Sequence, residues 1–198
     1  MKEKLKWFFN SFIWLGVLGL IVDIITKLVI KTNLVEGQRN DLIPGFLAIT
    51  FTYNEAAAFG MGFDNPEVNK WMYIVIALVV SAVIIFFFVK KFDKFNKFLR
   101  ACLMLIVAGA IGNVIDRFIY GKVVDFIDFY GIWNAIFNVA DCCIVIGTIM
   151  LIVYLIIEEV KEYRRKKKEE PEPQGKVLSK EEQERLKRDS EPEEIEKE

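Results

Sequence analysis

The sequence predicts an integral membrane α-helical protein with four transmembrane helices, a small extracytoplasmic β-sheet and a short interfacial helix. Three observations carry this prediction. Four apolar blocks each approach the ~20 residues that cross a ~30 Å hydrocarbon core. Lys and Arg concentrate in alternate connections, and one loop has a strand-like alternation. The composition agrees, because 54% of the 198 residues are hydrophobic and 17 are Phe.

The helices are expected at residues 12–30, 71–89, 101–117 and 137–157. The first block is longer than the apolar region of a typical signal peptide and carries Asp23 and Lys27. No small-residue cleavage site follows it, so we expect a retained helix.

Basic residues predict the orientation. They precede the first helix, separate the second from the third, and follow the fourth, whereas loops 32–70 and 118–136 hold few. Because short cytoplasmic loops are enriched in Lys and Arg, both termini should be cytoplasmic and these two loops should face outward.

The two outward loops and the tail differ in character. In loop 32–70, residues 40–45 favour a turn, and apolar residues alternate over 49–53 as in a strand. Loop 118–136 is rich in aromatics, which predicts a short helix or turn at the lipid interface. Residues 1–160 should form the membrane domain. The charged tail, 161–198, should be disordered or a loose solvated helix with no catalytic role.

Polar groups converge on one side of this predicted membrane domain. Ionisable side chains at membrane depth are costly and mark functional sites. The helix directions bring these groups to the outer surface: Asp23, Lys27, Asn113, Asp116, Arg117, Asn138 and Asp141 from helices, and Asn54 and Asp125 from loops.

Most of these groups also have a simpler structural explanation. The alternatives are an intrahelical ion pair for Asp23 with Lys27, an interfacial anchor for Asp116 with Arg117, close helix packing for Gly109 and Gly112, a helix cap for Asn138, and surface charge for Asp125 and Asp128. Asp141 is harder to explain in this way. It has no basic residue within a helical turn, so it needs a partner from elsewhere in the fold.

The available chemistry is narrow. The chain has no His, which excludes histidine-based catalysis and most zinc sites. The three Cys lie in apolar runs without metal-binding spacing, and no Ser lies at i+3 or i+4 from Lys27. Carboxylates remain. When two aspartate carboxyl groups lie close together in space, one keeps its proton and the other is ionised. The protonated group can donate to a carbonyl oxygen while the ionised group activates water, which is the chemistry of aspartic proteolysis and needs no metal or cofactor.

Five segments between residues 23 and 141 resemble the lipoprotein (type II) signal peptidases of bacteria, in the family's order. They are Asp23-Ile-Ile-Thr-Lys27, Asn54-Glu-Ala-Ala-Ala-Phe-Gly60, Ala108-Gly-Ala-Ile-Gly-Asn-Val-Ile-Asp-Arg117, Val124-Asp-Phe126 and Phe137-Asn-Val-Ala-Asp141. Ala56 and Ala108 stand where the family usually has Gly, which affects fine packing rather than chemistry.

The resemblance implies that Asp125 and Asp141 are the catalytic dyad. The residues implied to shape the site and hold substrate are Asp23, Lys27, Asn54, Gly109, Asn113, Asp116, Arg117 and Asn138. The implied substrate is a prolipoprotein with diacylglyceryl on its lipobox cysteine, cut on the N-terminal side of that cysteine. Membrane lipid and globomycin-type inhibitors are further implied partners, with no nucleic acid. The implied location is the bacterial inner membrane, with the site near its outer face.

Two other functions compete with a peptidase. An ion-coupled carrier would need polar groups near the bilayer midplane, where these helices have almost none. A non-enzymatic subunit would use the polar groups to dock a partner helix. The separation of the Asp125 and Asp141 carboxyl groups discriminates between these options, because a dyad needs the two groups side by side.

Overall fold

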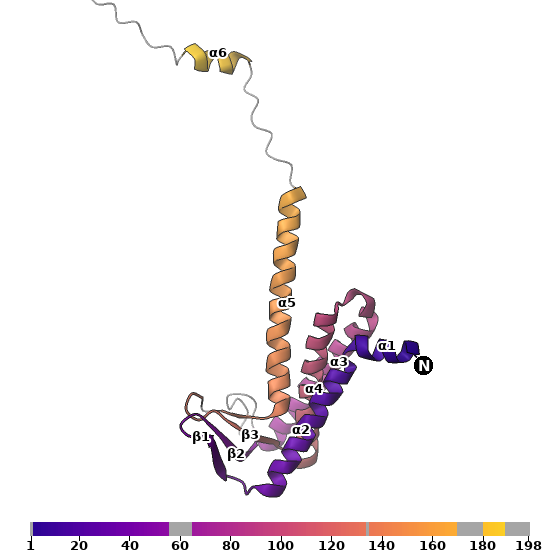
Figure 1. Cartoon of the computed structure of the whole chain (residues 1–198), viewed down its shortest axis with the longest axis vertical. Helices are drawn as coiled ribbons and strands as arrows, with labels where there is room; N and C mark the ends of the chain where they lie inside the picture. Colours follow the sequence, from indigo (N-terminus) through magenta and orange to yellow (C-terminus); the bar gives the residue numbers. More distant parts are fainter. Residues whose placement is uncertain (1, 56–64, 134, 170–179, 189–198) are drawn as a thin grey trace, which may run out of the picture. The chain divides into compact units, whose positions relative to one another are not determined.

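Four long helices and one sheet form the first of two units of the chain (Figure 1). A computed structural model describes residues 2–55, 65–133, 135–169 and 180–188. The units are Met1–Ile156 and Ile157–Glu198. The helices α2 (Ile13–Asn33), α3 (Pro66–Lys90), α4 (Lys97–Tyr120) and α5 (Val139–Glu169) are each long and apolar enough to cross a membrane. The four-helix prediction is confirmed.

Helices α3 and α4 begin before the predicted apolar blocks, at polar cap residues. Helix α3 begins at Pro66, and the Asn65 side chain accepts hydrogen bonds from the amides of Glu67 and Val68. Asn at the cap and Pro at the first helical position are both favourable. Asn96 caps α4 in the same way by accepting from the Leu99 amide at 2.8 Å. Hydropathy alone does not detect these polar first turns.

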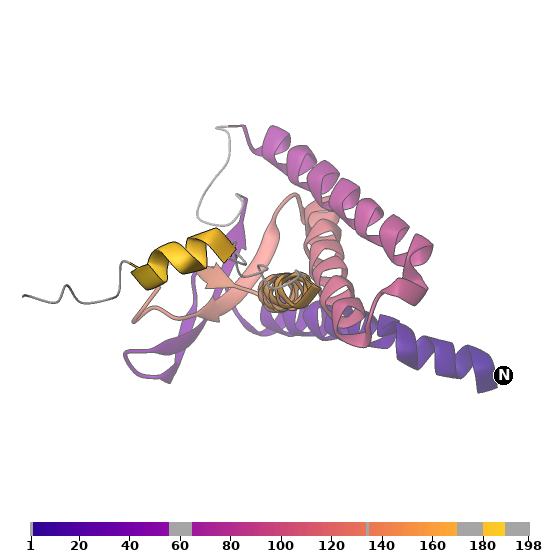
Figure 2. The same ribbon diagram turned by 90° about the horizontal axis from the view of Figure 1, so that it is seen from above.

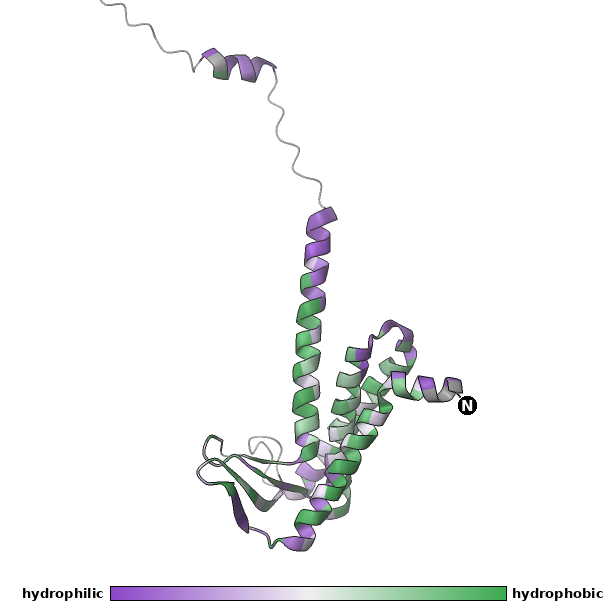
Figure 3. Cartoon of the chain, in the orientation of Figure 1, coloured by the Kyte–Doolittle hydropathy of each residue, from purple (hydrophilic) through white to green (hydrophobic). Residues whose placement is uncertain are grey.

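Helix α4 is the central helix of the bundle. Half of its most apolar 18-residue window is buried inside the protein, against 11% for α2 and 17% for each of α3 and α5. It packs between α2 and α3 (Figure 2). Hydrophobic residues cover the outward surfaces of the bundle (Figure 3). Apolar surface on the outside of a bundle is expected where lipid replaces water as the solvent.

Small residues let α4 approach its neighbours closely. A Cβ at Gly109 would overlap the Ala140 carbonyl oxygen of α5. At Gly147, on α5, a Cβ would lie 2.9 Å from the Cys102 carbonyl oxygen of α4. On the opposite side, a Cβ at Gly16 of α2 would lie 3.0 Å from the Met104 carbonyl oxygen. Close backbone approach through small residues is typical of helix packing in membranes.

The sheet is antiparallel and has the strand order β1-β2-β3-β4. The strands are β1 (Arg39–Ile43), β2 (Leu47–Asn54), β3 (Val123–Asp128) and β4 (Ile136–Phe137). Strand β2 contains the alternating segment 49–53 predicted as a strand. Residues 39–43 form β1, where the sequence predicted only a turn, and the turn itself follows at Gly45, whose φ is +78°.

The second outward loop differs from its prediction. Instead of a short interfacial helix, its described residues form β3, a turn and β4. Residues 123–127 are mostly β-branched or aromatic, which favours a strand. The decisive contribution is tertiary, because β2 lies alongside and pairs with β3, with Thr52 opposite Asp125 and Tyr53 opposite Val124.

Two short helices were not predicted. Helix α1 (Lys2–Ser11) ends where Phe12 adopts a φ of +60°, and the chain bends there into α2 (Figure 1). The 3₁₀ helix η2 (Phe92–Lys94) lies between α3 and α4. Arg100 joins the two, since its guanidinium donates to the carbonyl oxygens of Asn10 at 3.0 Å and Phe92 at 2.9 Å.

The second unit contains the end of α5 and helix α6 (Lys180–Arg188). Residues 159–169 and the described side chains of α6 are exposed. The described parts of the tail are therefore solvated helix, one of the two alternatives expected from its composition. Residues 170–179 and 189–198 lie outside the described part.

A methyl group at Gly109 tests the close contact between α4 and α5. We expect Gly109→Ala to lower the free energy of unfolding by about 1–3 kcal/mol, because the new Cβ meets backbone that cannot yield without separating the helices. Gly19→Ala is the matched control, since its Cβ would meet side-chain atoms alone, the Cys143 sulfur at 3.2 Å and the Ala108 Cβ at 4.0 Å. Thermal unfolding in detergent measures both, and equal stability of the two variants would contradict this packing.

Candidate active site

A buried lysine lies at the centre of the polar residues. Lys27, on α2, is 3% exposed. Its Nζ lies 2.9 Å from Asp23 Oδ2 and 3.2 Å from Asp116 Oδ2 of α4, and donates to Asn113 Oδ1 at 3.1 Å. Burying a charge this deeply is costly unless it is paired and hydrogen-bonded. Lys27 therefore has three partners where the sequence suggested one intrahelical pair.

The two carboxylates paired with Lys27 also hold backbone from other elements. Asp23 Oδ1 accepts from the Ala140 amide at 2.8 Å, at the start of α5. Asp116 Oδ2 accepts from the Val124 amide at 3.0 Å, in β3. Each amide belongs to the residue immediately before one of the two predicted catalytic aspartates. The Lys27 cluster thus fixes the backbone on which Asp125 and Asp141 stand.

The local sequence explains how β3 reaches the cluster. Helix α4 ends at Gly121, which has a φ of +77°, and the Gly121 amide donates to the Arg117 carbonyl oxygen at 3.0 Å. Gly accepts this left-handed conformation without strain. The chain reverses after this cap, and β3 runs back against the end of the helix that bears Asp116.

Asp125 is 1% exposed and is held by two carboxamides. Asn54, at the end of β2, donates to Asp125 Oδ2 at 2.8 Å, and Asn138 donates to Asp125 Oδ1 at 2.6 Å. A buried carboxyl group needs such partners, because an unpaired one would lose its hydration without compensation. The ordinary surface-charge alternative for Asp125 is therefore wrong.

Asp141 takes part in a reciprocal cap at the start of α5. Asn138 Oδ1 accepts from the Asp141 amide at 2.8 Å, while the Asn138 amide donates to Asp141 Oδ2 at 3.2 Å. This pattern is a capping box with Asp in the place of Glu. The second carboxylate oxygen, Asp141 Oδ1, accepts from Asn113 Nδ2 at 2.8 Å.

Asn138 links the two aspartates. Its backbone amide contacts Asp141, and its side-chain nitrogen contacts both Asp125 and, at 3.1 Å, Asn113 Oδ1. Asn138 is completely buried. One residue therefore spans the gap between two carboxyl groups that come from different elements, so Asp125 and Asp141 face the same site.

Burial and the neighbouring charge of Asp141 raise the pKa of Asp125 from 3.8 to about 7, although hydrogen bonds from Asn54 and Asn138 oppose the shift. The neutral form of a carboxyl group is favoured by desolvation and by a nearby negative charge. Asp125 therefore keeps its proton to a much higher pH than an ordinary aspartate, and about half of the molecules carry it at pH 7. This is the asymmetry that a carboxyl pair needs to provide an acid and a base together.

Arg117 and Gly109 complete the surroundings. The Arg117 charge interacts with Asp141 and Asp125, and its guanidinium lies 5.0 Å from the centre of the Tyr73 ring of α3. Gly109 packs against the carbonyl of Ala140, which precedes Asp141. These positions differ from the interfacial-anchor alternative, because both Arg117 and its neighbour Asp116 face the site.

The structure brings all ten residues predicted for the site into or against one network, and it adds a glycine. A Cβ at Gly112 would lie 2.6 Å from Asp23 Oδ2, so only Gly leaves room for that carboxylate. The sequence indicated that Gly112 is a packing residue but gave no sign of its carboxylate neighbour.

The predicted motif that begins at Asn54 lies outside the described residues from Ala56 on. Within the described part of the chain, no group of three acidic, Cys or His side chains could hold a metal ion.

The fold and the site define a class of protein: a multi-span membrane protein with two linked aspartates, one buried and one partly buried, at one end of its helix bundle, as in an aspartic peptidase. Comparison with known proteins gives the family. Residues 15–157 match the family model of signal peptidase (SPase) II. The chain belongs to this family of membrane aspartic peptidases.

Individual relatives support the assignment. The chain is 36% identical over 160 residues to a lipoprotein signal peptidase of Staphylococcus haemolyticus, covering 77% of this chain and 95% of that protein. It is 36% identical over 142 residues to the lipoprotein signal peptidase of Fusobacterium nucleatum, covering 72% of this chain and 84% of that protein. A bacterial membrane enzyme solved by the in meso method at 2.3 Å superposes with a TM-score of 0.67 at 34% identity, covering 74% of this chain and 88% of that one.

The raised pKa of Asp125 can be measured directly. We expect an infrared carboxyl C=O band that disappears with a midpoint near pH 7 and that is missing in Asp125→Asn. Asp141→Asn should lower this midpoint, because the Asp141 charge contributes to the shift. Since folding takes up a proton on Asp125, stability should also fall as pH rises from about 4 to 7. A band with its midpoint near pH 4 would contradict the burial described for Asp125.

Proposed function

We propose that the protein removes the signal peptide from diacylglyceryl-modified prolipoproteins by cleaving on the N-terminal side of the lipidated cysteine, with Asp125 and Asp141 as the dyad. The relatives named as lipoprotein signal peptidases support the substrate class. The observation that carries the residue assignment is the link through Asn138, which donates a hydrogen bond to each of the two carboxyl groups.

The proposed reaction uses the unequal protonation of the pair. Protonated Asp125 donates its proton to the oxygen of the scissile carbonyl. Asp141 removes a proton from a water molecule, whose oxygen attacks the carbonyl carbon. The tetrahedral intermediate then collapses, the carbon–nitrogen bond breaks, and the proton held by Asp141 passes to the leaving cysteine nitrogen. Asp125 recovers its proton from the intermediate, so the pair is ready for another cycle.

The remaining site residues have supporting roles in this proposal. Asp23, Lys27 and Asp116 position the backbone before each aspartate. Asn54, Asn113 and Asn138 orient the carboxyl groups, and Gly109 keeps α5 close to α4. Arg117, whose positive charge interacts with both aspartates, is the candidate to bind the substrate backbone. Such preorganisation contributes to catalysis by fixing the geometry before the substrate arrives.

Exposed apolar residues near the site fit a lipid-modified substrate. Phe118 and Ile119 follow Arg117 on α4 and are 66% and 61% exposed, and Trp133 is 48% exposed beside β4. Acyl chains that rest on this surface would remain in lipid while the cysteine backbone enters the site. Globomycin-type inhibitors would compete for the same surface and dyad.

The distribution of basic residues supports the proposed orientation. The lysine-rich connection between α3 and α4 lies at the end of the bundle opposite the site, and in the sequence basic residues also occur in α1 and at the end of α5. By the preference of basic residues for the cytoplasm, both termini are cytoplasmic and the dyad lies near the outer face of the inner membrane. Residues 1–160 form the peptidase domain, and 161–198 form a charged cytoplasmic tail.

Asp125→Asn and Asp141→Asn should each abolish cleavage, with a loss of at least about 100-fold, because each removes a group that transfers a proton. The assay is mass spectrometry of a synthetic diacylglyceryl-modified prolipoprotein peptide, with and without globomycin. Asp128→Asn is the matched control on β3, since Asp128 is also buried but accepts from Thr50 Oγ1 at 2.7 Å, away from the pair.

Retained turnover by either dyad variant would overturn the residue assignment. Cleavage by the unmodified protein of the same peptide without its lipid, at an equal rate, would instead overturn the proposed substrate class.

A further inference from the structure

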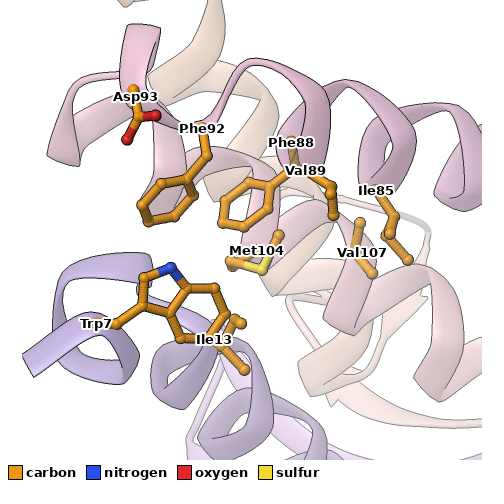
Figure 4. A pocket seen from close by; sticks show the side chains of 9 residues that line it. All are labelled: Trp7, Ile13, Ile85, Phe88, Val89, Phe92, Asp93, Met104 and Val107. Atoms are coloured by element: carbon orange, nitrogen blue, oxygen red, sulfur yellow. The ribbon is translucent and has the colours of Figure 1, made fainter. Parts of the chain in front are cut away.

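An apolar cavity of about 570 Å³ lies far from the dyad (Figure 4). Its wall combines α1, α2, α3, η2 and α4 through Trp7, Ile13, Phe88, Phe92, Met104 and Val107, with Ile85, Val89 and Asp93 completing the lining. Asp93 is the one ionisable residue among these, and it lies at the edge of the group in Figure 4. The volume falls within the range of small-molecule sites.

The cavity and the candidate active site occupy opposite ends of α4. Met104 precedes Asp116 by twelve residues, which corresponds to about 18 Å along a helix. On α2, Ile13 precedes Asp23 by a similar interval. No residue of the cavity wall belongs to the network around Lys27. The cavity is therefore a separate feature, and changes within it leave the dyad and its supports untouched.

The cavity is accessible from the side of the bundle that faces lipid. Trp7 is 51% exposed and Val89 is 70% exposed, although both are apolar lining residues. The Trp7 ring packs on Phe92 with centroids 5.6 Å apart, and Arg100 joins the end of α1 to η2. Helix α1 is thus held as a wall of the cavity, at the membrane depth where an indole ring is favoured.

Four lysines, which we call the lysine rim, adjoin cavity-lining residues in the sequence. Lys6 precedes Trp7, Lys90 and Lys91 separate Val89 from Phe92, and Lys94 follows Asp93. All four side chains are exposed, against the two acids Glu3 and Asp93 in the same segments. An apolar cavity open to lipid, with a net positive rim at the membrane surface, matches a molecule with an apolar chain and an anionic head.

We propose that this cavity binds one acyl chain of an anionic phospholipid, whose phosphate contacts the lysine rim. The rim argues against the other apolar occupant available to this family, the signal peptide of a substrate. Signal peptides begin with a positively charged segment, which the lysines would repel. Anionic lipid heads are attracted to basic residues at the membrane surface.

The test uses Trp7 as a reporter. Trp14, Trp71 and Trp133 are replaced by Phe, and the full chain is reconstituted in phosphatidylcholine vesicles that contain a dibrominated lipid, which quenches nearby Trp fluorescence. Quenching by dibrominated phosphatidylglycerol should saturate at a mole fraction at least about fivefold lower than quenching by dibrominated phosphatidylcholine. Lys91→Gln with Lys94→Gln should remove most of this preference.

A filling variant separates the cavity from general lipid contact. Val89→Phe, which places a ring in the cavity, should weaken the saturable quenching at least about threefold. Val83→Phe is the matched control, because Val83 is on the same helix and is 50% exposed but does not line the cavity. Equal quenching by both lipids, or no difference between Val89→Phe and Val83→Phe, would overturn the proposal. Displacement of the brominated lipid from Trp7 by a basic signal peptide at equimolar concentration would also overturn it, in favour of the peptide as occupant.

Discussion

The structure depends on one buried cation shared by two carboxylates. Lys27 lies between Asp23 and Asp116 and is almost fully excluded from solvent. A lone ammonium in such a place would lose its hydration at a cost of several kcal/mol, and so would each carboxylate. The three groups therefore require one another. Because each carboxylate also accepts a backbone amide, the same pairing that makes burial tolerable fixes the start of α5 and the middle of β3.

This arrangement explains why the surrounding architecture takes its form. Helix α4 must touch α2 through Lys27 and touch α5 through Gly109, so it occupies the centre of the bundle and carries small residues at the contacts. The sheet then brings Asn54 of β2 to Asp125 of β3, two residues separated by 71 positions in the chain. The proposed catalytic pair is thus assembled from the start of α5 and from β3, whose sheet forms only by long-range pairing of strands.

Hydropathy and spacing were sufficient to predict the four helices, the convergence of the polar residues at one end of the bundle and the strand over 49–53. They failed where a long-range partner decides the outcome. Val123–Asp128 formed a strand because β2 lies alongside it, and Arg39–Ile43 formed a strand by pairing with β2. Within the site, the i, i+3 spacing of Asn138 and Asp141 in the sequence is that of a capping box, so this contact has a sequence signature. In contrast, the amides of Val124 and Ala140 have no side-chain signature, so their contacts with Asp116 and Asp23 could be found only in three dimensions.

Residue-resolved amide hydrogen exchange of the protein in lipid vesicles tests the central role of Lys27 most directly. The Val124 and Ala140 amides should be protected in the unmodified chain and should exchange at least about tenfold faster in Lys27→Met, whereas amides within α3 stay unchanged. Lys31→Met, one turn later on α2, is the control and should leave both amides protected. Full protection of Val124 and Ala140 in a folded Lys27→Met protein would contradict the account, because the two aspartates would then be positioned without the buried cation.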